Sequence, residues 1–131
     1  MASRNLDIGF IGIGVLGRGL SLALAERGYR VAGAHSRSEA SARWLADRIP
    51  GCDVYASAQA LSDVSGLVFI TTPDSAIEEV TRSVNWRYGQ GVVHCCGGAS
   101  IELLKSAAQQ GAMTGAFHPF QTFAGLASPE E

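Results

Sequence analysis

The sequence lacks both a long apolar segment and an excess of charge of one sign. No apolar run in its 131 residues approaches the roughly 18 residues of a membrane-spanning helix, and the first residues contain no hydrophobic signal segment. The formal net charge is -2, and hydrophobic residues make up 47% of the chain. We therefore expect one soluble, cytoplasmic domain with an ordinary core, and neither a membrane partner nor a nucleic-acid-binding surface.

Cysteine and lysine are also scarce. The cysteines, Cys52, Cys95 and Cys96, are odd in number and do not have the C-x-x-C spacing of zinc and redox sites, so we expect reduced thiols. His94 stands beside the cysteine pair, but neighbouring side chains in a strand point to opposite faces of the sheet. This disfavours a metal site, and we expect none. Lys105 is the only lysine.

Short apolar runs alternate along the chain with segments of helical periodicity. The expected strands are residues 6–13, 29–35, 53–56, 66–72, 91–96 and 112–118. The expected helices are residues 15–28, 38–51, 57–62, 73–84 and 100–111. This alternation is typical of βαβ units, so we predict an α/β fold with a Rossmann-type, doubly wound, mainly parallel sheet and helices on both faces. Ligands of such sheets bind at the carboxyl ends of the strands, near the point where the strand order reverses.

Three glycines form a G-x-G-x-x-G motif between the first expected strand and the first expected helix: Gly12, Gly14 and Gly17. In dinucleotide-binding folds the first glycine permits a tight turn, the second lets a diphosphate approach the main chain, and the third lets the helix pack close to the strand. The amides of Val15 and Leu16 would then face the phosphates from the positive end of the helix dipole. The alternative is that the glycines serve only the packing of strand against helix.

The residues after the second expected strand favour NADP over NAD. NAD sites usually place Asp or Glu at this point to bind the ribose hydroxyls. This chain has Ser36, Arg37 and Ser38 there, and no carboxylate before Glu39. A guanidinium and hydroxyls suit a 2′-phosphate, which a carboxylate would repel. The alternatives are that Arg37 is only a solvated surface charge, or that the glycine loop belongs to a methyltransferase using S-adenosylmethionine, although that class usually has the missing acid.

Four segments together resemble one bacterial family: residues 9–31, 68–80, 92–100 and 115–124. They are similar to the amino-terminal part of proteins that join a Rossmann-like domain to a helical carboxyl-terminal domain of unknown function, within the 6-phosphogluconate-dehydrogenase-like superfamily. The resemblance covers essentially the whole chain. It implies a dinucleotide-binding domain at residues 1–117 and, at residues 118–131, an exit segment leading to a helical domain that this chain does not contain.

The last four residues, SPEE, have the pattern of a helix start, with a serine N-cap followed by proline and glutamate. We therefore expect this chain to be the first domain of a longer protein. The alternative is a naturally short chain with a polar tail.

The resemblance implies an oxidoreductase domain that binds NADP(H), in an enzyme that transfers hydride to or from a small oxo or hydroxy acid, or an imine. Its nucleotide domain is similar to those of ketopantoate reductases, pyrroline-carboxylate reductases, prephenate dehydrogenases and β-hydroxyacid dehydrogenases. The lysine acid of the last group is not expected here, because Lys105 lies in a helix away from the site. Homodimers in this superfamily form mainly through the helical domain. The alternative function is a non-enzymatic dinucleotide-binding or redox-sensing module.

The resemblance also places residues of later strands at the site. Thr71, Thr72 and Pro73 would lie along the ribose and diphosphate; the alternative is that they only cap a helix. Cys96 and Gly97 would lie against the nicotinamide or the substrate, although family members have a hydroxyl residue in place of Cys96, and a thiol is a weaker donor. The alternative there is a tight turn.

His118 is the candidate for proton transfer. It ends the last expected strand and is fixed by Pro119, and an imidazole titrates near neutrality. A histidine that only makes an interdomain hydrogen bond is the alternative.

Overall fold

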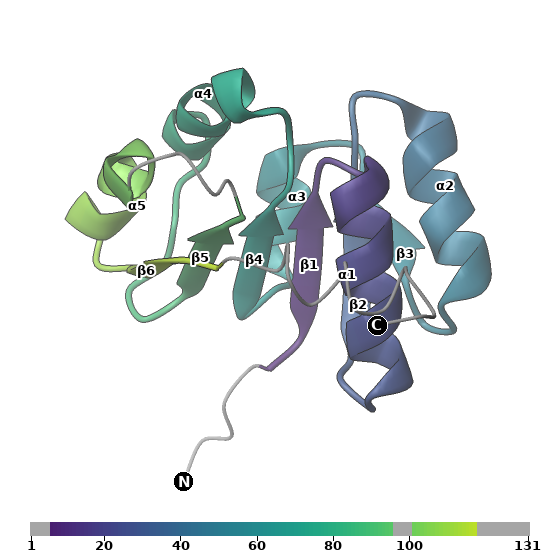
Figure 1. The fold of residues 1–131 in the computed structure, drawn as a ribbon. Helices are drawn as coiled ribbons and strands as arrows, with labels where there is room; N and C mark the ends of the chain where they lie inside the picture. Colours follow the sequence, from purple (N-terminus) through teal and green to yellow (C-terminus); the bar gives the residue numbers. More distant parts are fainter. Residues whose placement is uncertain (1–5, 96–100, 118–131) are drawn as a thin grey trace, which may run out of the picture.

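The computed structural model describes residues 6–95 and 101–117 (Figure 1). Its strands are β1 (Ile8–Ile11), β2 (Val31–His35), β3 (Asp53–Val54), β4 (Leu67–Ile70), β5 (Gly91–His94) and β6 (Met113–Ala116). Its helices are α1 (Val15–Glu26), α2 (Glu39–Arg48), α3 (Ala58–Asp63), α4 (Ile77–Arg82) and α5 (Lys105–Gln109). Short 3-10 turns at Asp74–Ala76 and Ile101–Leu104 precede α4 and α5.

The strands form one sheet in the order β3-β2-β1-β4-β5-β6, and every pairing is parallel. The predicted α/β fold with a doubly wound parallel sheet is therefore confirmed. The strand order reverses between β1 and β4, which lie side by side at the centre. In sheets of this kind the crevice at the carboxyl ends of these two strands is the usual ligand site.

Helices cover both faces of the sheet, as Figure 1 shows. From β1 to β2 and from β2 to β3, each crossover moves toward the β3 edge of the sheet. From β3 to β4, from β4 to β5 and from β5 to β6, each crossover moves toward the β6 edge. Right-handed crossovers then place α1 and α2 on one face and α3, α4 and α5 on the opposite face. The two buried clusters follow this division, because Phe10 and Leu45 pack on the side of α1 and α2, and Ile70 and Leu104 pack on the other side.

The helices in the second half of the sheet are shorter than expected. The segments predicted as helices at 73–84 and 100–111 begin as 3-10 turns, and no side chain caps α4 or α5. An uncapped first turn often tightens into 3-10 geometry, which explains the difference. The parts of the expected elements that fall at residues 96–100 and at residue 118 lie outside the described residues.

Leu61 of α3 packs against two glycines in the central strands. Its side chain is fully buried. A Cβ atom at Gly9 would lie 2.8 Å from Leu61 Cδ1, and one at Gly33 would lie 2.7 Å from Leu61 Cδ2. These glycines therefore make room for α3, a role of Gly9 that the sequence pattern did not reveal.

We expect the substitution Leu61→Ala to lower the free energy of unfolding by about 2 to 5 kcal/mol, because it leaves a cavity between α3 and the sheet. Urea denaturation followed by circular dichroism measures this change. Val64→Ala, at the exposed end of the same helix, is the control and should change stability by less than about 0.5 kcal/mol. Equal losses in both variants would contradict this packing role.

Candidate functional site

The glycine loop, residues 12–17, joins the end of β1 to the start of α1 at the carboxyl edge of the sheet. Gly12 has φ +91, which strongly favours glycine, and a Cβ atom there would lie 2.6 Å from the backbone nitrogen of Thr72. The Gly12 N–H donates to the carbonyl oxygen of His35 at 2.8 Å. The loop is thus held between the ends of β2 and β4.

Gly17 lets α1 approach the sheet closely. A Cβ atom on this residue would lie 2.7 Å from the Gly12 carbonyl oxygen and 2.8 Å from Thr71 Oγ1. Neither atom lies at the far end of a flexible side chain, so it could not move away cheaply. Two of the glycines in the motif are therefore explained by the fold itself.

Gly14 has no such explanation. It is exposed, its φ of -93 and ψ of -160 are extended values open to other residues, and a Cβ atom there would meet nothing within 4 Å. Packing of strand against helix cannot account for a glycine at this position. Its lack of a side chain instead leaves space above the main chain for a ligand.

The amino terminus of α1 faces this space without a cap. No side chain caps the helix, its first turn contains no acidic residue, and Val15 is 90% exposed. The first amides of a helix have no partner within the helix. By contrast, Ser38 and Ser57 accept hydrogen bonds from the first turns of α2 and α3. The open donors and the helix dipole at α1 suit an anion such as a diphosphate.

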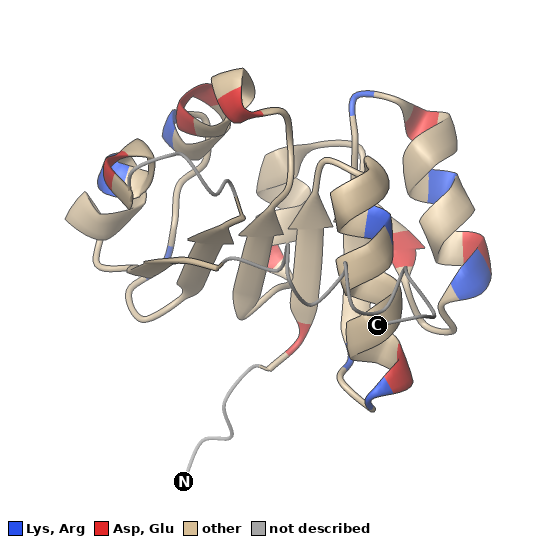
Figure 2. Cartoon of the chain, viewed as in Figure 1, with Lys and Arg blue, Asp and Glu red and all other residues tan. Residues whose placement is uncertain are grey.

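Charged side chains are absent from this part of the molecule, as far as the structure describes it. Residues 12–17 and strands β1, β4 and β5 contain no Asp, Glu, Lys or Arg, and Figure 2 shows the charges mainly on the helices and at their ends. No carboxylate on the glycine loop would repel a diphosphate.

A second candidate subsite follows β2. Ser36 Oγ accepts a hydrogen bond from the Ser38 N–H at 3.1 Å, and Ser38 Oγ accepts one from the Ser41 N–H at 3.3 Å. Arg37 is exposed and forms no ion pair with any described residue. Glu39, the first acid, is 3.5 Å from Arg43. A guanidinium without an ion pair to any described residue and two serine hydroxyls thus stand together at the start of α2, as a phosphate site requires.

Sequence reasoning missed two residues near this subsite. Ser41 Oγ donates to Ser38 Oγ at 3.2 Å, so a third hydroxyl belongs to the cluster. His35 Nδ1 donates to the carbonyl oxygen of Tyr55 at 2.9 Å, while its own carbonyl accepts from Gly12. The position of His35 as the last residue of a strand beside the glycine loop was the signal that could have found it.

A stack of side chains joins the two subsites. The guanidinium carbon of Arg18, in α1, lies 4.5 Å from the ring centroid of Trp44 in α2, and that of Arg48 lies 3.8 Å from it. Arg48 also donates to the Trp44 carbonyl oxygen at 2.9 Å. The Arg18–Trp44 contact links α1 to α2, whereas the Arg48–Trp44 contact lies within α2.

The residues after β4 lie beneath the glycine loop rather than above it. Thr71 is 8% exposed, and its hydroxyl donates to the carbonyl oxygen of Gly12. Thr72 packs against Gly12, and its buried hydroxyl oxygen has no hydrogen-bond partner among the described residues. Pro73 is exposed and precedes the 3-10 turn. The Thr72 hydroxyl oxygen is thus buried under the loop, and a place for Thr72 along the cofactor stays a prediction.

The remaining predicted site residues, Cys96, Gly97 and His118, lie outside the described residues. Of the other thiols, burial raises the pKa of Cys95 to about 12, and burial together with the charge of Asp53 raises the pKa of Cys52 to about 11. Both thiols therefore stay protonated at neutral pH and are poor nucleophiles. These two cysteines give no support to a redox-sensing function.

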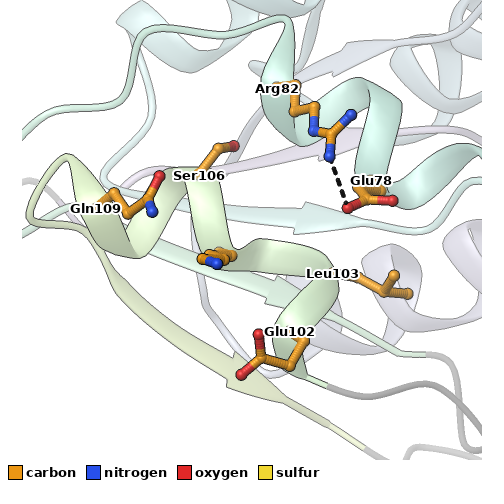
Figure 3. Close-up of a pocket in the computed structure, with 7 residues that line it drawn as sticks. Glu78, Arg82, Glu102, Leu103, Ser106 and Gln109 are labelled. Carbon is orange, nitrogen blue, oxygen red and sulfur yellow. Dashed lines mark hydrogen bonds and ion pairs between the residues drawn. The ribbon is translucent and has the colours of Figure 1, made fainter.

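A cavity of about 220 Å³ lies between α4 and the segment containing α5, on the sheet face opposite α1 (Figure 3). Its lining residues are Glu78, Arg82, Glu102, Leu103, Lys105, Ser106 and Gln109. Arg82 and Glu78 pair with each other at 3.1 Å. The cavity is smaller than most sites for small organic ligands, and its acidic and basic side chains balance. It is not a candidate dinucleotide site.

A family model described as the Rossmann-like domain matches residues 1–119. The chain belongs to this family. The predicted resemblance to a Rossmann-like domain is thereby confirmed. No curated protein sequence matches the chain.

Solved structures share the fold of this Rossmann-like domain. A reductive aminase from Aspergillus terreus in complex with NADPH and ethyl levulinate has a TM-score of 0.71 and 19% identity, covering 84% of this chain and 39% of the aminase. An imine reductase from Pseudomonas sp. has a TM-score of 0.71 and 23% identity, covering 85% and 41%. A 3-hydroxyisobutyrate dehydrogenase from Mycobacterium tuberculosis has a TM-score of 0.72 and 19% identity, covering 84% and 39%. The chain spans about two fifths of the length of these proteins.

No helix in residues 6–95 or 101–117 has the length and apolar character needed to cross a membrane.

The contrast between Gly17 and Gly14 gives a prediction on stability. We expect Gly17→Ala to lower the free energy of unfolding by about 1 to 3 kcal/mol, since its methyl group clashes with the Gly12 carbonyl. Gly14→Ser should leave stability unchanged or raise it by roughly a few tenths of a kcal/mol, because serine is a slightly better N-cap than glycine and has room there. Thermal and urea unfolding measure both effects. A large loss of stability in Gly14→Ser would show that the fold itself needs this glycine.

The raised pKa values give a prediction on thiol chemistry. In a Cys96→Ser variant we expect Cys52 and Cys95 to react with Ellman's reagent at pH 8 at least about tenfold more slowly than in the urea-unfolded chain, because their thiols are buried and protonated. The protonated form also stabilises the fold, so this contribution is complete below about pH 9 and is lost as pH rises toward the folded pKa values of about 11 and about 12. Rapid labelling of the folded variant would contradict this.

Proposed function

We propose that this Rossmann-like domain binds NADP(H) and forms the cofactor-binding part of an oxidoreductase. The observation that carries the proposal is Gly14, a glycine that neither φ nor packing requires, at the uncapped start of α1. A diphosphate lying over this residue would accept hydrogen bonds from the amides of Val15 and Leu16. The space for a ligand and the donors for its charge therefore coincide.

The choice of NADP over NAD rests on the second subsite. Ser36, Arg37, Ser38 and Ser41 place hydroxyls and an unpaired guanidinium at the end of β2, where a carboxylate would select NAD. A 2′-phosphate would accept hydrogen bonds from Arg37 and from the Ser36 and Ser38 hydroxyls, while the Ser41 hydroxyl donates to Ser38 Oγ. The reductive aminase with a similar fold holds NADPH in its structure, which agrees with this assignment.

NADPH would supply a hydride from its nicotinamide ring to a carbonyl or imine carbon of a small substrate. Thr72 and the exposed Pro73, after the end of β4, would lie along the cofactor beside the loop. Cys96 and Gly97 would line the nicotinamide end. His118 would deliver or take the proton that accompanies hydride transfer.

Small oxo or hydroxy acids and imines are the proposed substrates. Relatives in fold include an imine reductase and a hydroxyacid dehydrogenase, and one structure holds the keto ester ethyl levulinate. Hydride transfer requires the reacting atoms to be enclosed and held about 3 to 3.5 Å apart. We assign this enclosure, and the contacts of a homodimer, to a helical domain that follows residues 118–131 in a longer bacterial, cytoplasmic protein.

Calorimetric titration with NADPH, NADH and S-adenosylmethionine tests this proposal. We expect NADPH to bind most tightly of the three. Arg37→Gln should lower the affinity for NADPH by at least about tenfold and change the affinity for NADH by less than about twofold, since only NADPH has the 2′-phosphate. Arg27→Gln, at the far end of α1, removes the same charge and is the control. Gly14→Ser should weaken both dinucleotides. Tighter binding of S-adenosylmethionine, or unchanged NADPH affinity in Arg37→Gln and Gly14→Ser, would contradict the proposal.

A further inference from the structure

Thr71 joins the end of β4 to the glycine loop through both of its polar groups. Its N–H donates to the Ile11 carbonyl oxygen at 2.8 Å, and its hydroxyl donates to the carbonyl oxygen of Gly12. The side chain is 8% exposed and lies under the loop. Because the hydroxyl proton is already donated to the main chain, it is not available to a ligand.

The same hydroxyl also touches the other end of the loop. A Cβ atom on Gly17 would lie 2.8 Å from Thr71 Oγ1 and 2.7 Å from the Gly12 carbonyl oxygen. The hydroxyl, the carbonyl and the first turn of α1 are therefore in mutual contact. One side chain from a distant strand holds both the start and the end of the glycine loop.

This contact restricts the conformation of Gly12, the first residue of the loop. Gly12 has φ +91, and a glycine exchanges easily between conformations unless its neighbours fix it. A peptide unit is planar and trans, so fixing the Gly12 carbonyl toward Thr71 turns the Ile13 N–H to the opposite side. The Gly12 N–H is fixed separately by His35. Without the Thr71 hydroxyl, the loop would lose the contact that sets the direction of its first peptide.

We propose that Thr71 is a positioning residue: its hydroxyl holds the glycine loop in the shape that binds a diphosphate, without touching the cofactor. This inference rests on the proposed function of the domain. A loop that is ordered before binding loses less conformational freedom when the ligand arrives, so the hydroxyl raises affinity for every ligand that carries the diphosphate. It does not affect the choice between NADPH and NADH, because the two share that group.

The test compares Thr71→Val, which keeps the shape but removes the hydroxyl, with Thr71→Ser, which keeps the hydroxyl. We expect valine to weaken NADPH and NADH equally, by about three- to tenfold, as loss of one buried hydrogen bond implies. Serine should restore both affinities to within about twofold. Adenosine 2′-monophosphate, which has no diphosphate, should bind to wild type and both variants alike. Amide hydrogen exchange of residues 13–17 in the free protein should be faster in the valine variant only.

Three outcomes would overturn this role. Wild-type NADPH affinity in Thr71→Val would show that the hydroxyl does not position the loop. If Thr71→Val lost as much affinity for adenosine 2′-monophosphate as for NADPH, valine would disturb the whole domain rather than the loop alone. Wild-type protein that binds adenosine 2′-monophosphate but no dinucleotide would contradict the proposed function itself, whereas the first two results would leave that function standing.

Discussion

The close approach of α1 to the central strands is the contact on which the rest of the site depends. Gly12 and Gly17 have no side chains, so the helix start lies directly against the ends of β1 and β4, and the Thr71 hydroxyl fills the space between them. This approach puts the amides of the first turn at the crevice where the strand order reverses. A side chain at either glycine would push the helix away, and the helix dipole would no longer face the crevice.

The same approach determines where the second subsite lies. The guanidinium of Arg18 in α1 lies over the Trp44 ring of α2, so one cation–π contact links the two helices. His35 contributes from the sheet, since its carbonyl binds Gly12 and its ring binds the main chain at Tyr55. The two candidate subsites of the proposed function therefore lie on neighbouring helices that follow adjacent strands of one sheet.

The sequence predicted the order and type of the elements well, because apolar periodicity reflects burial and glycines mark many of the turns between elements. It also identified Gly12, Gly14 and Gly17 through their spacing. It could not show that Gly14 differs from the other two, because that difference depends on which atoms surround each Cα position in space. Two further contacts were hidden for the same reason. Thr71 binds Gly12, 59 positions earlier in the chain, and Leu61 packs against Gly9 and Gly33. No local sequence pattern shows a contact between residues that are distant in the chain.

Thr71 and Gly14 show how one loop combines stability with binding. The Thr71 hydroxyl, Gly12 and Gly17 together make the base of the loop rigid, and their contacts lie within the protein. Above them, Gly14 leaves α1 without a side-chain cap, although serine caps the two helices that follow. A glycine N-cap in place of serine lowers helix stability by only roughly a few tenths of a kcal/mol. A side chain at this position would satisfy the same amides that a diphosphate would use in the proposed function, whereas glycine leaves them open to a ligand.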